Sequence, residues 1–177
     1  MKIVALLRGL NVGKHNRLKM PALVDVFEQL GCVDVTTYIQ SGNVLFTAPA
    51  ALVTQLPKRV AAALEQDHDV RSPVILRTGK ELAAALTRNP FLAKPHDVAN
   101  LHVAFLADKP TKAAAASLDP ARSPPDELAL VGRDLYLHFP KGQGRTKLTN
   151  AYFDTTLETL STVRNWNTLT ALAALAA

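Results

Sequence analysis

Basic side chains gather near the start of this sequence, in a stretch that contains no acid. No Asp or Glu occurs before Val24. The cations of this stretch are Arg8, Lys14, Arg17 and Lys19. The stretch joins an apolar run to a helix that Pro21 should open, so backbone N–H groups and the positive end of that helix point to one place. Such a loop could hold a phosphate or a carboxylate, whereas the alternative is a loop of solvated cations.

Two further polar stretches without acids lie between apolar segments. Residues 38–46 read YIQSGNVLF, and residues 142–150 read GQGRTKLTN. If these loops converge on the first loop, they form one anion site. The predicted ligand-binding residues are Arg8, Asn11, Lys14, Lys19, Gln40, Ser41, Asn43, Arg145, Lys147 and Arg164.

Each of these stretches also has a structural explanation. Ser41 and Gly42 are turn residues that a hairpin would select for geometry alone. The loop at 142–150 could be a solvated, mobile loop. Alternatively, the polar residues only hold the two halves together; Arg8 and Asn11 would then hydrogen-bond to the turn at 40–43 inside the fold, and no ligand exists.

Familiar nucleotide motifs are absent. Gly9 and Gly13 precede Lys14, but a Walker loop needs a wider glycine spacing and a Ser or Thr where His15 stands. The later Gly-x-Gly pattern fails as a dinucleotide fingerprint because Lys147 occupies the third glycine position.

The remaining reactive side chains predict packing rather than catalysis. The histidines show no metal-ligand spacing; they are His15, His68, His96, His102 and His138. His102 and His138 fall in predicted strands and should be packed or edge residues, and Cys32, which follows a helix end, should be a small core residue. Trp166 should be a core residue, and Asn165 or Asn167 should cap the last helix. We find no acid–base pair that indicates a reaction.

Composition sets the broad class. The net charge of +5 permits a polyanionic partner without requiring one. A single cysteine rules out an intramolecular disulfide and fits a reducing compartment. The apolar runs at both ends are shorter than a signal peptide core or the ~20 residues of a membrane span. We therefore expect a cytoplasmic protein with no cofactor, no metal and no membrane partner; its oligomeric state stays open.

The first half of the chain predicts strand, helix, strand, strand, helix, strand. Residues 3–7 are a continuous apolar run typical of a buried strand. A helix between Pro21 and Gly31 repeats apolar residues at helical spacing. The other predicted elements are strands at 33–40, 44–47 and 70–78, and a helix at 50–66 that Pro57 kinks or starts anew. This order is that of a ferredoxin-like fold.

The second half repeats the order after a linking helix at 81–88. The predicted elements are strands at 101–106, 127–131, 135–139 and 161–164, helices at 111–118 and 149–160, and a terminal helix at 168–177. The fold class is therefore α+β, with two ferredoxin-like (βαββαβ) halves with antiparallel sheets plus a C-terminal helix. The predicted halves are 1–88 and 98–177 with a linker at 89–97; alternatively, the chain forms one compact unit.

Several motifs together resemble one bacterial family, domain of unknown function 1697. They are MKIVALLRGLNVGKHNRLKM, TYIQSGNVLF, RNPF, LHVAFL, GRDLYLHFP, GRTKLTNAYF and TRNWNT. The resemblance runs from Met1 to about Leu172 and implies an α+β fold of ferredoxin-like halves, but no activity. The typical family loop reads N-V-G-G-K-N, and Lys14 replaces its second glycine here, which weakens the case for close approach of a ligand at that point.

The sequence supports two functional hypotheses of different kinds. The first is a binding protein whose basic loops hold a phosphate-bearing ligand, either nucleic acid or a nucleotide. An RRM-like pattern of exposed aromatics is missing, which counts against sequence-specific RNA stacking. The second is a cofactor-independent enzyme that acts on a small anionic substrate, with Arg8 or Lys147 stabilising charge.

Overall fold

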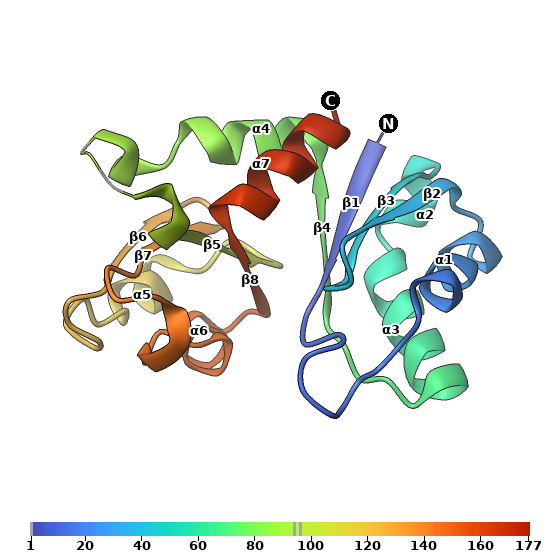
Figure 1. Cartoon of the computed structure of the whole chain (residues 1–177), viewed down its shortest axis with the longest axis horizontal. Helices are drawn as coiled ribbons and strands as arrows, with labels where there is room; N and C mark the ends of the chain where they lie inside the picture. The colour runs from blue at the N-terminus through green and yellow to red at the C-terminus, as the bar shows by residue number, and fades with distance from the viewer. Residues whose placement is uncertain (1, 94, 96) are drawn as a thin grey trace. The chain divides into compact units, whose positions relative to one another are not determined.

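The computed structural model describes residues 2–93, 95 and 97–177. The chain divides by its contacts into two compact units, Met1–Leu82 with Leu172–Ala177, and Ala83–Ala171. Each unit is built on one four-stranded antiparallel sheet (Figure 1). The predicted α+β class, with two βαββαβ-like sheets and a C-terminal helix, is confirmed.

The sequence predicts a boundary between the halves at a linker, residues 89–97, whereas the contacts divide the chain after Leu82. The linker predicted at 89–97 includes Lys94 and His96, which lie outside the described residues. Around them the chain forms 3-10 turns at Pro90–Ala93 (η1) and Val98–Asn100 (η2). Halves at 1–88 and 98–177 stay a prediction.

The first sheet has the strand order β2-β3-β1-β4. Its strands are β1 (Lys2–Leu7), β2 (Val33–Tyr38), β3 (Asn43–Thr47) and β4 (Val74–Thr78). All neighbouring strands are antiparallel. β4 begins at Val74 rather than at the predicted residue 70, because Pro73 just before it has no N–H to donate to a strand ladder.

Helices α1 (Met20–Gln29) and α3 (Leu56–His68) cover one face of this sheet (Figure 1). Their buried residues, such as Phe27 and Leu64, pack with Ala5 and Phe46 of the strands. Of the two alternatives for the helix predicted at 50–66, the structure shows the restart: α2 (Ala50–Val53) ends, and α3 starts anew with Pro57 in its first turn. Proline fits only the first turn of a helix, so the chain restarts there.

The second sheet has the strand order β6-β7-β5-β8. Its strands are β5 (Leu101–Leu106), β6 (Glu127–Val131), β7 (Asp134–His138) and β8 (Ser161–Asn165). Its other elements are α5 (Lys112–Ala116), the 3-10 turn η3 (Gln143–Arg145) and α6 (Asn150–Leu157). α6 ends before the predicted residue 160 because Glu158 adopts a left-handed conformation, with φ 54°.

The strand registers repeat from one unit to the other. Val4 of β1 pairs with Arg77 of β4, and Val103 of β5 pairs with Arg164 of β8. The two arginines are both buried, with relative exposures of 1% and 9%. Equivalent positions in the two sheets therefore carry the same buried side chain, which extends the repetition beyond element order.

Each sheet is followed by a helix, α4 (Gly79–Thr87) after β4 and α7 (Trp166–Leu175) after β8. Trp166 is buried, and Asn165 caps α7 by accepting a hydrogen bond of 2.8 Å from the Thr168 N–H, as predicted. The C-terminal end of α7 belongs to the first unit, where Lys2 Nζ donates to the Leu175 carbonyl at 3.1 Å. The start of β1 and the end of α7 therefore lie side by side (Figure 1).

No helix within the described ranges is both long and apolar enough to cross a membrane.

Candidate functional site

The basic loop between β1 and α1 is a folded structure. Gly9, Asn11, Gly13 and Asn16 all have positive φ angles, so the chain reverses repeatedly over a few residues. Buried Leu10 and Leu18 anchor its two ends in the core of the first unit. The loop is therefore an ordered platform whose outer residues face solvent.

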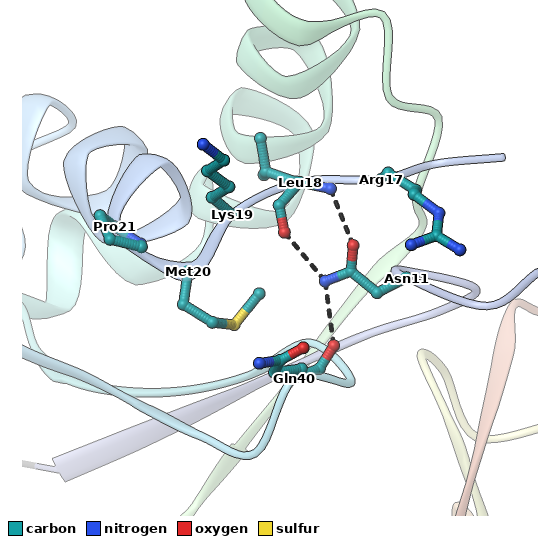
Figure 2. A pocket seen from close by; sticks show the side chains of 7 residues that line it. All are labelled: Asn11, Arg17, Leu18, Lys19, Met20, Pro21 and Gln40. Carbon is teal, nitrogen blue, oxygen red and sulfur yellow. Dashed lines mark hydrogen bonds between the residues drawn. The ribbon is translucent and has the colours of Figure 1, made fainter. Parts of the chain in front are cut away.

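Asn11 fixes the shape of this loop (Figure 2). Its Nδ2 donates to the Leu18 carbonyl at 2.9 Å and to the Gln40 carbonyl at 3.0 Å. Its Oδ1 accepts from the Leu18 N–H at 2.8 Å. Asn11 thus makes the hydrogen bond to the Gln40 turn that the structural explanation requires, and its amide is used by the fold.

A pocket of about 640 Å³ lies beside Asn11, between the loop, the start of α1 and the β2–β3 turn (Figure 2). We call it the basic pocket. It is lined by Asn11, Arg17, Leu18, Lys19, Met20, Pro21 and Gln40. Among the described residues that line it, none is acidic. Met20 extends toward Gln40, whereas Lys19 extends away from Gln40, so the pocket has an apolar and amide interior with a charged rim (Figure 2).

The cations of the loop differ in how they are held. Arg17 Nη2 donates to the Gly13 carbonyl at 2.9 Å, which aligns its guanidinium along the loop. Lys19 is exposed and is the N-cap of α1, but its side chain makes no capping hydrogen bond. Lys14 is exposed at the loop tip. The helix start and its adjacent cations together make this end of the first unit attractive to anions.

Arg8 lies at the other side of the loop and is half-buried. Its main chain is fixed to the segment before β4: the Arg8 N–H donates to the Pro73 carbonyl at 3.0 Å, and Ser72 Oγ donates to the Arg8 carbonyl at 2.7 Å. Arg8 does not line the basic pocket.

The β2–β3 turn uses most of its own polar groups. Asn43 is fully buried, and its Nδ2 donates to the Tyr38 carbonyl at 3.2 Å and to Ser41 Oγ at 3.1 Å. Ser41 and Asn43 therefore close the turn, as the turn hypothesis predicted. Gln40 alone of the three candidates in this turn lines the basic pocket.

Sequence reasoning missed one connection of the loop. Asn16 Nδ2 donates to the Arg71 carbonyl at 3.0 Å, and the Arg71 N–H donates to Asn16 Oδ1 at 3.1 Å. The Arg71 side chain pairs with Glu65 at 2.8 Å, so an acid does approach this end of the unit. No local pattern in the sequence could have revealed a pairing across 55 positions.

The candidates of the second unit lie in and near η3. Arg145 and Lys147 are exposed. The loop that carries them is held by its backbone, because the Lys147 N–H donates to Ser123 Oγ at 3.0 Å and Arg122 Nε donates to the Lys147 carbonyl at 3.2 Å. A pocket of about 500 Å³ in this unit is lined by Thr146, Thr149 and their neighbours, but by neither Arg145 nor Lys147.

Arg164 is buried within β8 rather than exposed. Its Nη1 donates to Thr162 Oγ1 and to the Val163 carbonyl, both at 2.9 Å. Burial lowers the pKa of the guanidinium to about 10, because a charged group is disfavoured away from water.

Other groups with a displaced pKa are also packed inside the fold. Burial raises the pKa of the Cys32 thiol and of the Tyr136 hydroxyl, and it lowers the pKa of His102. Tyr136 donates to the Ala85 carbonyl at 2.8 Å, and the His102 ring packs against that of Phe139 in a tilted arrangement. None of these groups lines the basic pocket. Over the part of the chain that the structure describes, no three His, Cys, Asp or Glu residues lie together as metal ligands.

The fold and the pocket define an α+β protein of two ferredoxin-like units with a basic pocket at one end of the first. The chain belongs to the family described as protein of unknown function (DUF1697), whose model matches residues 1–136. No curated protein matches it. A solved structure, "conserved bacterial protein SP0830 from Streptococcus pneumoniae", is similar with a TM-score of 0.67 and 22% identity, over 99% of this chain and 98% of that one. At that identity the likeness shows the fold alone.

Proposed function

We propose that the protein binds a phosphate-bearing ligand, a nucleotide or nucleic acid, at the basic pocket. The observation that carries the proposal is the combination of cations and cavity: Arg17 and Lys19 flank a space of about 640 Å³ whose described lining contains no acid. Clustered cations attract phosphates, and the start of α1, where the described Lys19 side chain makes no capping hydrogen bond, adds the positive end of a helix beside them.

The interior of the basic pocket suits the rest of a nucleotide. Met20 and Pro21 offer apolar surface that a base or a ribose could contact. The Gln40 side chain makes no hydrogen bond to another described residue, so its amide is available to donate and to accept. A phosphate at the charged rim and a base against Met20 would use both parts of the pocket.

The test is fluorescence polarisation of labelled single- and double-stranded oligonucleotides at low and at physiological salt, followed by thermal-shift measurements with nucleotides. The double variant Arg17→Ala/Lys19→Ala should weaken binding and lower the slope of log affinity against log salt by about 1 for each phosphate interaction that it removes. Binding that disappears at physiological salt would mean that the attraction is only non-specific and electrostatic.

The matched control is Lys58→Ala/Arg59→Ala. These exposed cations lie on α3 of the same unit, so the control removes the same charge at a different place. If both double variants weaken binding equally, the effect comes from net charge, and the basic pocket is not the site.

A further inference from the structure

A second pocket lies in the first unit, on the side of the sheet that α1 and α3 do not cover. It has a volume of about 560 Å³. We call it the hydroxyl pocket, and the residues that characterise it are Lys2, Thr36, Tyr38, Leu45, Thr47 and Leu175; Thr37 and Phe46 complete its walls. Asp34 also lies on its rim.

The strand register explains why these side chains meet. Thr36 of β2 pairs with Leu45 of β3, and Thr47 of β3 pairs with Lys2 of β1. Paired residues of an antiparallel sheet project to the same face, and residues two apart on a strand do so too. Tyr38 therefore joins Thr36 on this face, while alternate residues such as Val44 pack with the helices on the other.

The end of α7 forms one wall. Leu175 lines the pocket, and its carbonyl accepts a hydrogen bond of 3.1 Å from Lys2 Nζ. Gly79 allows the adjacent Ala176 to approach closely, because a Cβ at Gly79 would lie 2.2 Å from the Ala176 carbonyl oxygen. The wall is thus fixed between β1 and the start of α4, within the first unit.

The hydroxyl groups of this pocket are not used by the fold. The side chains of Thr36, Tyr38 and Thr47 make no hydrogen bond to another described residue. Each hydroxyl can donate once and accept twice. Leu45 at the floor is 6% exposed, so the hydroxyls surround an apolar base.

The charges at the rim balance. Lys2 contributes one positive charge and Asp34 one negative charge, and Lys2 is already bonded to the Leu175 carbonyl. Asp34 reaches the rim because β2 is irregular between Val33 and Thr36, where Asp34 adopts φ 53°. A pocket without net charge favours a ligand without net charge, because a charged ligand would lose hydration without a compensating partner.

We propose that the hydroxyl pocket binds a neutral, polyhydroxylated small molecule of about monosaccharide size. Ligand hydroxyls both donate and accept, as do the hydroxyls of Thr36, Tyr38 and Thr47, so the two sets can pair in either direction. The C–H face of a sugar ring would lie on Leu45 and Leu175. This site is separate from the basic pocket and shares no lining residue with it.

The experiment is a chemical-shift titration of the whole, isotope-labelled protein with a panel of hexoses, pentoses and myo-inositol. Two other ligand classes are tested in parallel, the free amino acid leucine and inorganic phosphate. Leucine is a zwitterion, so both of its charges could pair with the charges at the rim. We expect saturable shifts at Thr36, Tyr38 and Thr47 with at least one sugar or polyol. Its Kd should be on the order of millimolar, because so small a ligand offers few contacts.

Two variants test the contacts. Tyr38→Phe and Thr47→Val each remove one hydroxyl that the fold does not use, and each should weaken polyol binding about fivefold, as expected for one hydrogen bond. Thr54→Val is the control, since Thr54 is exposed in the same unit and its hydroxyl donates to the Ala51 carbonyl, away from the pocket. It should leave polyol binding unchanged.

Three results would overturn the proposal. They are the absence of saturable shifts up to tens of millimolar polyol, shifts that map elsewhere on the protein, and tighter binding of leucine or phosphate than of any polyol at these residues. Oligonucleotide binding in Tyr38→Phe and Thr47→Val should match that of the parent protein, so failure here is distinguishable from failure of the basic pocket.

Discussion

The basic pocket and the hydroxyl pocket belong to the same unit, yet the fold uses their polar groups in different ways. In the basic pocket the central amide, Asn11, makes hydrogen bonds to Leu18 and Gln40 that hold the loop. The groups left for a ligand are mainly charges at the ends of long side chains. In the hydroxyl pocket the strands are held by backbone pairing, and the hydroxyls of Thr36, Tyr38 and Thr47 make no hydrogen bond to another described residue.

This difference has a functional consequence. A charge on a flexible stem attracts anions over a distance but defines orientation poorly, and salt screens it. A hydroxyl on a strand has few rotamers, so it fixes the position of its partner at a smaller entropic cost. We therefore expect the basic pocket to bind phosphate-bearing ligands with little discrimination among them and with strong salt dependence. The hydroxyl pocket should bind polyols weakly but distinguish their stereoisomers.

Gly42→Ala should have the largest effect, because the turn beside the basic pocket tolerates no Cβ. Gly42 has φ 78°, and an added Cβ would lie 2.9 Å from Leu7 Cβ and 3.2 Å from the Leu7 carbonyl oxygen. Left-handed strain and overpacking together should cost about 2–4 kcal/mol, seen as a lower melting temperature.

The control for this variant is Gly132→Ala in the corresponding turn of the second unit. Gly132 has φ 65° but nothing within 4 Å of an added Cβ, so that variant carries the strain alone. Equal losses of stability in the two variants would show that close packing around Gly42 is unimportant.

Asn11→Ala should come next. It leaves the Leu18 N–H, the Leu18 carbonyl and the Gln40 carbonyl without their side-chain partner. Leu18 is buried, so the unfolding free energy should fall by about 2 kcal/mol, and the basic pocket should bind oligonucleotides less tightly. Polyol binding should not change, because Asn11 does not line the hydroxyl pocket.

Asn11→Gly separates the hydrogen bonds from the backbone strain. Asn11 has φ 57°, a conformation that glycine adopts freely. Because glycine also lacks the amide, a fully stable Asn11→Gly protein would contradict a structural role for the hydrogen bonds.

Much of the fold could be predicted because it follows from local patterns. The apolar run at 3–7 and the interval from Pro21 to Gly31 correspond to β1 and α1, and the strand at 101–106 matches β5 in full. The restart at Pro57 was among the predicted alternatives, whereas the strand at 70–78 was predicted too long, because the loss of a backbone donor at Pro73 outweighed the apolar pattern.

The candidate site could be predicted only in part. Of the predicted ligand-binding residues, Asn11, Lys19 and Gln40 line the basic pocket; Arg17, counted among the cations of the loop but not among the predicted ligand-binding residues, lines it too. The role of Asn11 depends on a carbonyl 29 positions away, and the wall of the hydroxyl pocket comes from Leu175, near the other end of the chain. Threonines are common in strands, so they can be recognised as pocket residues only when the strand register and the position of Leu175 are known.

Gly79→Ala should loosen the hydroxyl pocket at a moderate cost. The added Cβ would lie 2.2 Å from the Ala176 carbonyl oxygen, a backbone atom that must move. Because Ala176 follows the last residue of α7, this segment can shift without breaking a helix interior, and the cost should be about 1–2 kcal/mol. Polyol affinity should fall while oligonucleotide affinity is kept.

Gly144→Ala is the matched control for that variant, since Gly144 has no positive φ and nothing within 4 Å of an added Cβ. A Gly79→Ala protein with unchanged stability and unchanged polyol shifts would show that the end of α7 is not a fixed wall.

Lys147→Ala should have the smallest effect on stability. It tests whether the basic loop of the second unit takes part in anion binding. The Lys147 side chain is exposed, and the loop is held through its backbone by Ser123 and Arg122, so the unfolding free energy should change by no more than about 0.5 kcal/mol. Oligonucleotide affinity should nevertheless fall if this loop binds a phosphate.

Ser123→Ala is the control for this variant, because it removes the hydrogen bond to the Lys147 N–H and keeps the Lys147 charge. Weaker binding in Ser123→Ala alone would mean that loop geometry, and not the ammonium group, affects binding; weaker binding in Lys147→Ala alone would assign a phosphate interaction to the second unit as well as to the basic pocket.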